Sequence, residues 1–113
     1  MEIKTDALFD EELKKTIAFA LQEFGRKTAL RWRTQYRDIR HRMSIMPESY
    51  SPVLEFRNKT KLFRGATIMK NFKIIYFYNE ELDVVWLVDL WDLRQDPRKL
   101  RERARRIEKT VYL

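Results

Sequence analysis

Residues 72–78 (FKIIYFY) and 84–91 (VVWLVDLW) are two short runs rich in aromatic and β-branched side chains. Such side chains suit a pleated sheet, and only the turn Asn79–Asp83 separates the runs, so the pattern predicts a β-hairpin. The second run is apolar on both faces except at Asp89, which indicates a central or covered strand.

Two segments that precede this hairpin carry apolar residues at helical spacing. The first follows Asp6, a suitable N-cap, and stops near Gly25, which suits a left-handed C-terminal cap. The second covers about residues 27–45, so the two predict a helical hairpin. The predicted apolar stripes are Phe9, Leu13, Ile17, Ala20 and Phe24 on the first helix, and Ala29, Trp32, Tyr36, Ile39, Met43 and Met46 on the second.

The remaining segments complete an α+β pattern over one domain, residues 1–113. Glu2–Thr5 is predicted as an opening strand, Met46–Pro52 as a loop and residues 61–68 as a further strand. Asp96 and Pro97 are typical of a helix start, and the helix that follows has the stripe Leu100, Ala104, Ile107 and Val111. We expect an N-terminal strand and helical hairpin packed on a small, mostly antiparallel sheet, with a basic C-terminal helix.

Composition excludes several kinds of chemistry. The 113 residues include no Cys, one His (His41) and two Gly, which excludes disulfides, thiolate zinc sites, multi-histidine metal sites and a Gly-rich phosphate loop. We therefore expect no cofactor and no metal. No stretch resembles a membrane span or a secretory signal, so a cytoplasmic protein is expected, with no membrane partner.

Positive charge is concentrated in three blocks of this chain, whose formal net charge is +7. Residues 26–42 have net charge +6, residues 57–73 have six cations and no acid, and residues 98–113 have net charge +5. Such clusters favour a polyanionic partner, although solvated helix faces explain the two helical blocks about equally well. The 57–73 block lies on predicted strands and a turn, where that explanation is weaker.

The run from Phe72 to Tyr76, and the run Val84–Pro97 that ends in Arg-Gln-Asp-Pro, resemble the second half of the RelE/ParE superfamily of bacterial toxins. Phe24 and Gly25, with Ala29 soon after, also fit the usual start of that family. The resemblance is most specific over residues 64–97. It implies that the chain is the toxin of a type II toxin–antitoxin pair, a kind of system also described as a plasmid stabilization system. A small, acidic antitoxin is expected to neutralise it.

The resemblance also implies candidate site residues. RelE-like members cut mRNA on the ribosome without a metal, using cations to stabilise the developing phosphorane charge. By position, Arg64, Lys73 and Arg94 are the expected catalytic residues, and Lys59, Lys61 and Lys70 the expected RNA contacts. We expect five of these cations to meet on one concave face of the sheet, namely Lys59, Lys61, Arg64, Lys73 and Arg94. Two alternatives stay open: Lys59 and Lys61 as guards of an edge strand, and Arg94 as a partner of Asp92 or Asp96.

This sequence departs from the nuclease pattern at the proton-transfer group. Leu100 stands where a catalytic Tyr is expected, His41 falls on a helix, and Tyr112 is separated from Arg94 by the terminal helix. Glu55 is a possible base by position. Asp89 and Asp92 are expected on opposite faces of their strand, which makes a two-carboxylate site or a metal site improbable.

The expected function is ribosome-dependent mRNA cleavage, with the ribosome and mRNA as partners, and two alternatives stay open. ParE-like members share the fold but inhibit DNA gyrase by protein–protein contact, and a basic nucleic-acid-binding domain without toxicity also fits the charge. The stripe Leu100, Ala104 and Ile107 is predicted either to bind an antitoxin helix or to pack in the core. Most aromatic residues are expected in the core, with Trp91 and Tyr78 the most exposed.

Overall fold

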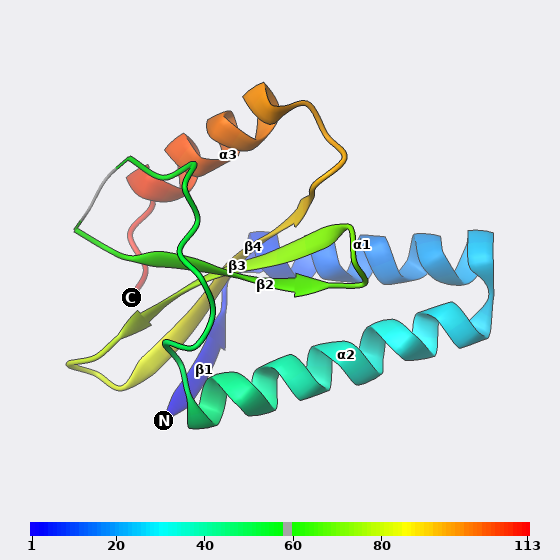
Figure 1. Ribbon diagram of the computed structural model, residues 1–113, viewed down its shortest axis with the longest axis horizontal. Helices are drawn as coiled ribbons and strands as arrows, with labels where there is room; N and C mark the ends of the chain where they lie inside the picture. The colour runs from blue at the N-terminus through cyan, green and yellow to red at the C-terminus, as the bar shows by residue number, and fades with distance from the viewer. Residues whose placement is uncertain (58–59) are drawn as a thin grey trace.

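The computed structural model describes residues 1–57 and 60–113, which form three helices and one four-stranded sheet (Figure 1). Lys59, a predicted RNA contact, lies outside the described residues. In chain order the elements are β1 (Glu2–Thr5), α1 (Ala7–Phe24), α2 (Arg26–Ile45), β2 (Phe63–Ile68), β3 (Phe72–Asn79), β4 (Val84–Asp92) and α3 (Pro97–Lys109). The predicted α+β class is confirmed.

The sheet has the strand order β1-β4-β3-β2. The pairs β2–β3 and β3–β4 are antiparallel, whereas β1 runs parallel to β4, so the sheet is mostly antiparallel, as predicted. The run 84–91 is a central strand with neighbours on both sides, in agreement with its apolar sequence. One irregularity interrupts the β3–β4 pairing, because Ile75 pairs with Asp89 while Tyr76 pairs with Leu87. Val88 is therefore an extra residue, which is a β-bulge.

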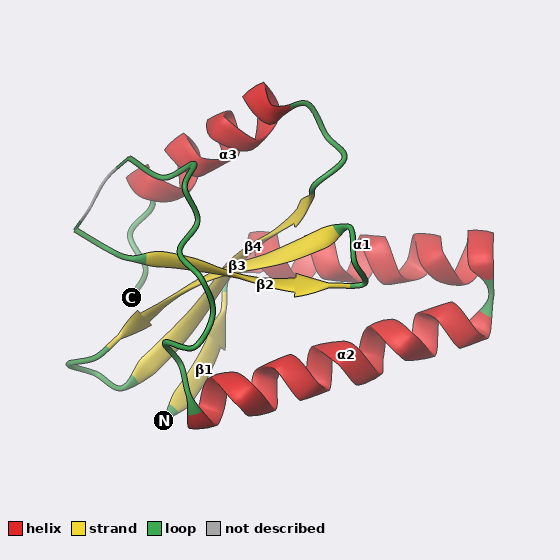
Figure 2. Ribbon diagram, in the orientation of Figure 1, coloured by secondary structure: helices red, strands yellow, loops and turns green. Residues whose placement is uncertain are grey.

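The sheet separates two apolar clusters. The helices lie on both sides of it, with the α1–α2 hairpin on one side and α3 on the other (Figure 2). The α1–α2 hairpin covers one face, which we call the hairpin face, where Phe9, Trp32 and Met43 pack on side chains such as Ile74. Helix α3 and the segment that contains Val53 and Phe56 cover the opposite face, which we call the α3 face. Alternate residues of β3 enter the two clusters, as the pleat of a strand requires.

Local signals in the sequence place the ends of the two hairpin helices correctly. The Asp6 carboxylate accepts a hydrogen bond from the Leu8 backbone N–H, and Gly25 links the helices with φ of 88°, a conformation that a side chain would strain. The stripes are less complete than predicted. Phe24 and Met46 are exposed rather than buried, because both lie at the ends of helices, beyond the sheet or next to a loop.

Helix α3 begins as predicted, since the Asp96 carboxylate accepts a hydrogen bond from the Arg98 N–H and Pro97 follows the cap. It ends at Lys109, so the prediction that Val111 belongs to its buried stripe is wrong; Val111 is 75% exposed. The prediction that Trp91 is exposed is also wrong, because Phe56 stacks on its ring under α3. In the described parts of the chain, no helix combines the length and the apolar character that crossing a membrane requires.

Candidate functional site

Arg64 lies on the hairpin face of β2 and has partners within the chain. Alternate residues of a strand share a face, so Ala66 and Ile68 lie on the same face as Arg64. Both belong to the cluster under α1 and α2. The guanidinium donates to the Tyr50 carbonyl over 2.7 Å and lies 3.6 Å from a Glu48 carboxylate oxygen, and the side chain is only 14% exposed. These contacts tie the loop after α2 to the sheet.

Lys73 lies on the opposite, α3 face of the sheet. It pairs with Thr67 on one side and with Trp91 on the other, and Trp91 belongs to the cluster under α3. Its aliphatic stem crosses Gly65, where an added Cβ would overlap Lys73 Cδ and Cγ. In the described part of the chain, its ammonium group has no carboxylate partner.

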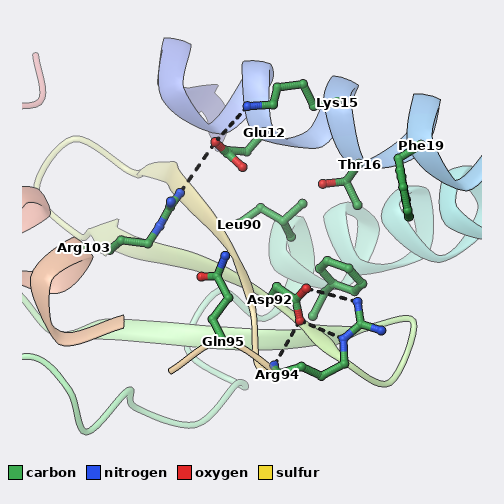
Figure 3. A pocket seen from close by; sticks show the side chains of 10 residues that line it. Glu12, Lys15, Thr16, Phe19, Leu90, Asp92, Arg94, Gln95 and Arg103 are labelled. Atoms are coloured by element: carbon green, nitrogen blue, oxygen red, sulfur yellow. Dashed lines mark hydrogen bonds and ion pairs between the residues drawn. The ribbon is translucent and has the colours of Figure 1, made fainter. Parts of the chain in front are cut away.

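Arg94 follows the end of β4 and forms a two-point ion pair with its neighbour. Its Nε and terminal nitrogen donate to the two carboxylate oxygens of Asp92, over 2.9 and 3.0 Å (Figure 3). The guanidinium also lies 5.3 Å from the centre of the Phe72 ring. Hydrogen bonds from Arg94 hold the pKa of Asp92 below its usual value. The alternative in which Arg94 pairs with Asp92 is the arrangement found here.

The three expected catalytic cations therefore do not meet on one face, and this part of the sequence interpretation is wrong. Arg64 is on the hairpin face and Lys73 on the α3 face. Arg94 is on the hairpin side, but its neighbour Phe72 and the Arg64 partner Tyr76 are four residues apart on β3, or about 13 Å. The error arises because the register of β2 against β3, which no local pattern reveals, decides which side chains share a face.

The two described RNA-contact candidates are also far apart. Lys61 lies 5.4 Å from the centre of the Phe77 ring, on the α3 face. Lys70 is exposed at the tip of the β2–β3 turn, where Met69 and Lys70 both have positive φ. Gln35 of α2 holds this turn by accepting a hydrogen bond from the Met69 N–H.

The stripe Leu100, Ala104 and Ile107 packs in the core. These residues are 5%, 0% and 1% exposed, because they face the α3 side of the sheet. The sequence left open whether they bind an antitoxin or fill the core, and the structure has them filling it. Antitoxin contact at these residues stays a prediction that would require α3 to leave the sheet.

The phenols that could move protons do not share one site with the three cations, because Tyr76 is the partner of Arg64 in the sheet whereas Tyr112 lies on the opposite face. Tyr112 folds back onto the α3 face, 5.6 Å from the Phe77 ring and 5.7 Å from the Trp86 ring, and burial raises its pKa to about 12. Tyr76 donates its hydroxyl proton to the Pro47 carbonyl, and burial raises its pKa to about 12 as well. His41 is exposed on α2. A phenol with this pKa is a poor general base near neutral pH.

A hollow of about 250 Å³ lies beside Arg94, between α1 and the end of β4 (Figure 3). Phe19 closes one end, and Arg103 of α3 lies at the other. Glu12 lies 3.9 Å from both the Lys15 ammonium and an Arg103 nitrogen, so acids and bases alternate along its wall. The mixed charge suits a polar protein surface better than a phosphate chain.

The sequence did not predict the ion pair between Asp89 and Arg103, which is partly buried and has two points of contact. Asp89 is 0% exposed, and Arg103 binds both of its carboxylate oxygens, over 2.6 and 2.9 Å. The Trp91 indole N–H also donates to Asp89. Hydrogen bonding to Asp89 raises the pKa of Arg103. The lone acid within an apolar strand was the available signal, but its partner lies 14 residues away.

Asp89 and Asp92 lie on opposite faces, as predicted, since Asp89 pairs with α3 whereas Asp92 contacts Arg94 over Phe72. Within residues 1–57 and 60–113, no group of three or more His, Cys, Asp or Glu side chains could hold a metal ion.

Comparison with known proteins identifies the fold. No protein-family model and no curated protein match the sequence. Among solved structures, one described as "Chromosomal ParDE TA system from P. aeruginosa" has a chain that superposes with a TM-score of 0.62 at 9% identity, over 83% of this chain and 97% of that one. A "metal-bound toxin from Helicobacter pylori" superposes with a TM-score of 0.57 at 16% identity, over 81% of this chain and 93% of that one. The chain therefore has the fold of these two structures, as the resemblance to RelE/ParE toxins implied.

Proposed function

We propose that this chain is the toxin of a type II toxin–antitoxin pair. The observation that carries the proposal is the fold, which matches more than four fifths of the chain to the ParDE and Helicobacter pylori toxin structures. The RelE/ParE-like run over residues 64–97 supports it independently. The role implies a cytoplasmic protein whose partner is a small antitoxin, and the net charge of +7 favours an acidic one.

For the mechanism, we favour inhibition through contact with a protein target, for which DNA gyrase is the ParE-like candidate. Arg64 and Arg94 are already engaged by groups of the chain itself, and Lys73 is on the other face from Arg64. Two phenols with pKa values of about 12 offer no group ready to move protons at neutral pH. Metal-independent cleavage by these three cations acting together therefore has little support.

Ribosome-dependent mRNA cleavage is the second candidate, and Lys73 is the observation that favours it. This side chain is held across Gly65, and no carboxylate of residues 1–57 or 60–113 pairs with it. A fixed cation of this kind can stabilise charge on a phosphate.

Cells that express the chain alone should separate the two mechanisms. Gyrase inhibition predicts induction of the DNA-damage response, and trapped gyrase–DNA complexes with the purified proteins, while mRNA stays intact. Cleavage predicts codon-phased 5′ ends by primer extension. Lys73→Ala should abolish these ends, while Lys14→Ala, which removes an exposed cation of α1, should not. Growth without arrest, together with salt-dependent nucleic-acid binding, would instead support the non-toxic binding domain.

A further inference from the structure

Helix α2 presents a long row of cations to solvent. Arg26, Arg33 and Arg37 are exposed, and steps of seven and four residues bring them to one side of the helix. At 1.5 Å per residue, the row extends for about 16 Å. Lys27 and Arg31 are exposed beside it, and Asp38 is the only acid of the whole helix.

These cations have almost no ion-pair partners among the described residues. Arg26, Lys27, Arg31 and Arg33 form no ion pair with any described residue, and Arg37 only approaches its neighbour Asp38 at 3.7 Å. Helix α3 is also strongly basic, but three of its seven cations, Arg98, Arg103 and Arg105, are paired with Asp96, Asp89 and Glu108. Contacts within the chain thus explain part of the basic composition of α3, whereas they explain little of the row on α2.

The arrangement on α2 also works against the stability of the helix. Arg26 and Lys27 lie in the first turn, which contains no acid, so they face the positive end of the helix dipole. Lys27 and Arg31, and likewise Arg33 and Arg37, are like charges four residues apart, a spacing that destabilises a helix. The stability of the helix therefore does not explain this charge pattern, whereas binding of an anionic ligand does.

The surface between Arg26 and Arg33 is hollowed. A depression of about 250 Å³ lies there, lined also by Leu21, Ala29 and Leu30. Two guanidinium groups on either side of a shallow hollow suit a phosphate or sugar–phosphate unit, because arginine offers a rigid fork of donors to phosphate oxygens.

We propose that the outer face of α2, centred on Arg26, Arg33 and Arg37, binds the phosphate backbone of a nucleic-acid duplex. A row of exposed cations releases counterions from such a backbone when it binds. A membrane is a poor occupant, because the apolar side of α2 is buried against the sheet and cannot insert. A protein partner is less suited, because the core of a protein interface is apolar and the described apolar residues that line this hollow are few, namely Leu21, Leu30 and the buried Ala29. The inference concerns binding alone and does not depend on toxicity.

The test compares two double variants of equal net charge. Arg26→Glu with Arg33→Glu reverses two cations of the α2 row, while Lys14→Glu with Arg101→Glu reverses two exposed cations of α1 and α3. Binding of the purified chain to fluorescent duplex DNA and to duplex RNA of the same sequence is followed by anisotropy from about 50 to 200 mM salt. Comparison of the two affinities shows whether a DNA backbone or an RNA backbone binds better to this face.

For the α2 variant, we expect the slope of log affinity against log salt to fall in magnitude by about 2, since each lost phosphate contact removes about 0.9. The control should keep nearly the wild-type slope. The melting temperature of the α2 variant should not fall, because a glutamate at position 26 suits the first turn and a glutamate at position 33 can pair with Arg37. Equal losses in both variants, or no duplex binding by the folded wild type, would overturn the proposal.

Discussion

Asp89 is the only fully buried charged side chain among the described residues, and it decides how α3 is held. Arg103 forms a two-point contact with it across the α3 face. The bulge at Val88 turns Asp89 toward α3, because without this extra residue Asp89 would share the hairpin face with Leu87.

Asp89→Ala should lower the free energy of unfolding by about 3–5 kcal/mol, because Arg103 would keep its charge in a partly buried place without a partner. Urea denaturation measures the change. The double variant Asp89→Leu with Arg103→Met should recover most of the loss, since an apolar pair avoids the desolvation of two charges. Wild-type stability in Asp89→Ala would show that the pair contributes nothing.

Gly65 and Lys73 are coupled by the space that they share. Gly65→Ala should be more destabilising when Lys73 is present than in a Lys73→Ala background, by about 1 kcal/mol, because the new methyl group overlaps the lysine stem. Four chemical denaturation curves complete the double-mutant cycle. If the two changes are additive, the lysine stem does not lie across the glycine in solution.

For single residues, the sequence predicts how the side chains of one strand alternate between the two faces of the sheet. It does not predict which residues of different strands share a face. Arg64 and Lys73 are cations in neighbouring strands, and the register that pairs Arg64 with Tyr76 and Lys73 with Thr67 separates them. The pairing of Asp89 with Arg103 likewise depends on the packing of α3, which no local pattern contains.

At the scale of elements, the described part of the segment between α2 and β2 forms specific contacts with the sheet. The Val53 N–H donates to the Phe63 carbonyl, and the Gly65 N–H donates to the Ser51 carbonyl, so this segment covers the outer edge of β2. Tyr76 holds its start through the Pro47 carbonyl. At the other end of the chain, Tyr112 holds the C-terminal tail on the α3 face.

These two tyrosines give a prediction for alkaline pH. Burial raises the pKa of Tyr76 and of Tyr112 from the ordinary 10.0 to about 12. Below about pH 10 both phenols are neutral in the folded and unfolded states, so their full contribution to stability is present. Between about pH 10 and 12 the unfolded chain ionises first, and stability is lost as pH rises.

Tyr112→Phe removes one of these groups, so its free energy of unfolding should fall less steeply above pH 10 than that of the wild type. Urea denaturation at pH 8, 9, 10 and 11 measures this. Parallel curves for the two proteins would contradict a raised pKa at Tyr112.

Elements with strong local signals were predictable. The helical hairpin, the β3–β4 hairpin and the start of α3 follow from periodicity and from caps at Asp6, Gly25 and Asp96. The prediction of a strand over residues 61–68 begins two residues before β2, and the predicted stripe of α3 runs past Lys109 to Val111. In both cases the sequence pattern extends past the residues whose backbone hydrogen bonds form the strand or the helix.

At the scale of the whole molecule, the fold places its basic segments on different sides of one sheet. The cations of α2 are exposed beyond the hairpin face, whereas Lys61 and Lys73 lie on the α3 face. This distribution favours contact with an extended partner over catalysis in one small pocket. The sequence predicted the charge blocks and the fold, but the separation of the blocks in space required the register and the packing of α3.

Toxicity that a partner neutralises is the central claim, and viable counts after induction test it most directly. Induced wild-type chain should stop colony formation, co-expression of the small protein encoded beside it should restore it, and Asp89→Ala, with its weakened fold, should be less toxic at equal expression. Normal growth of cells that contain abundant, soluble and folded wild-type chain would contradict the claim.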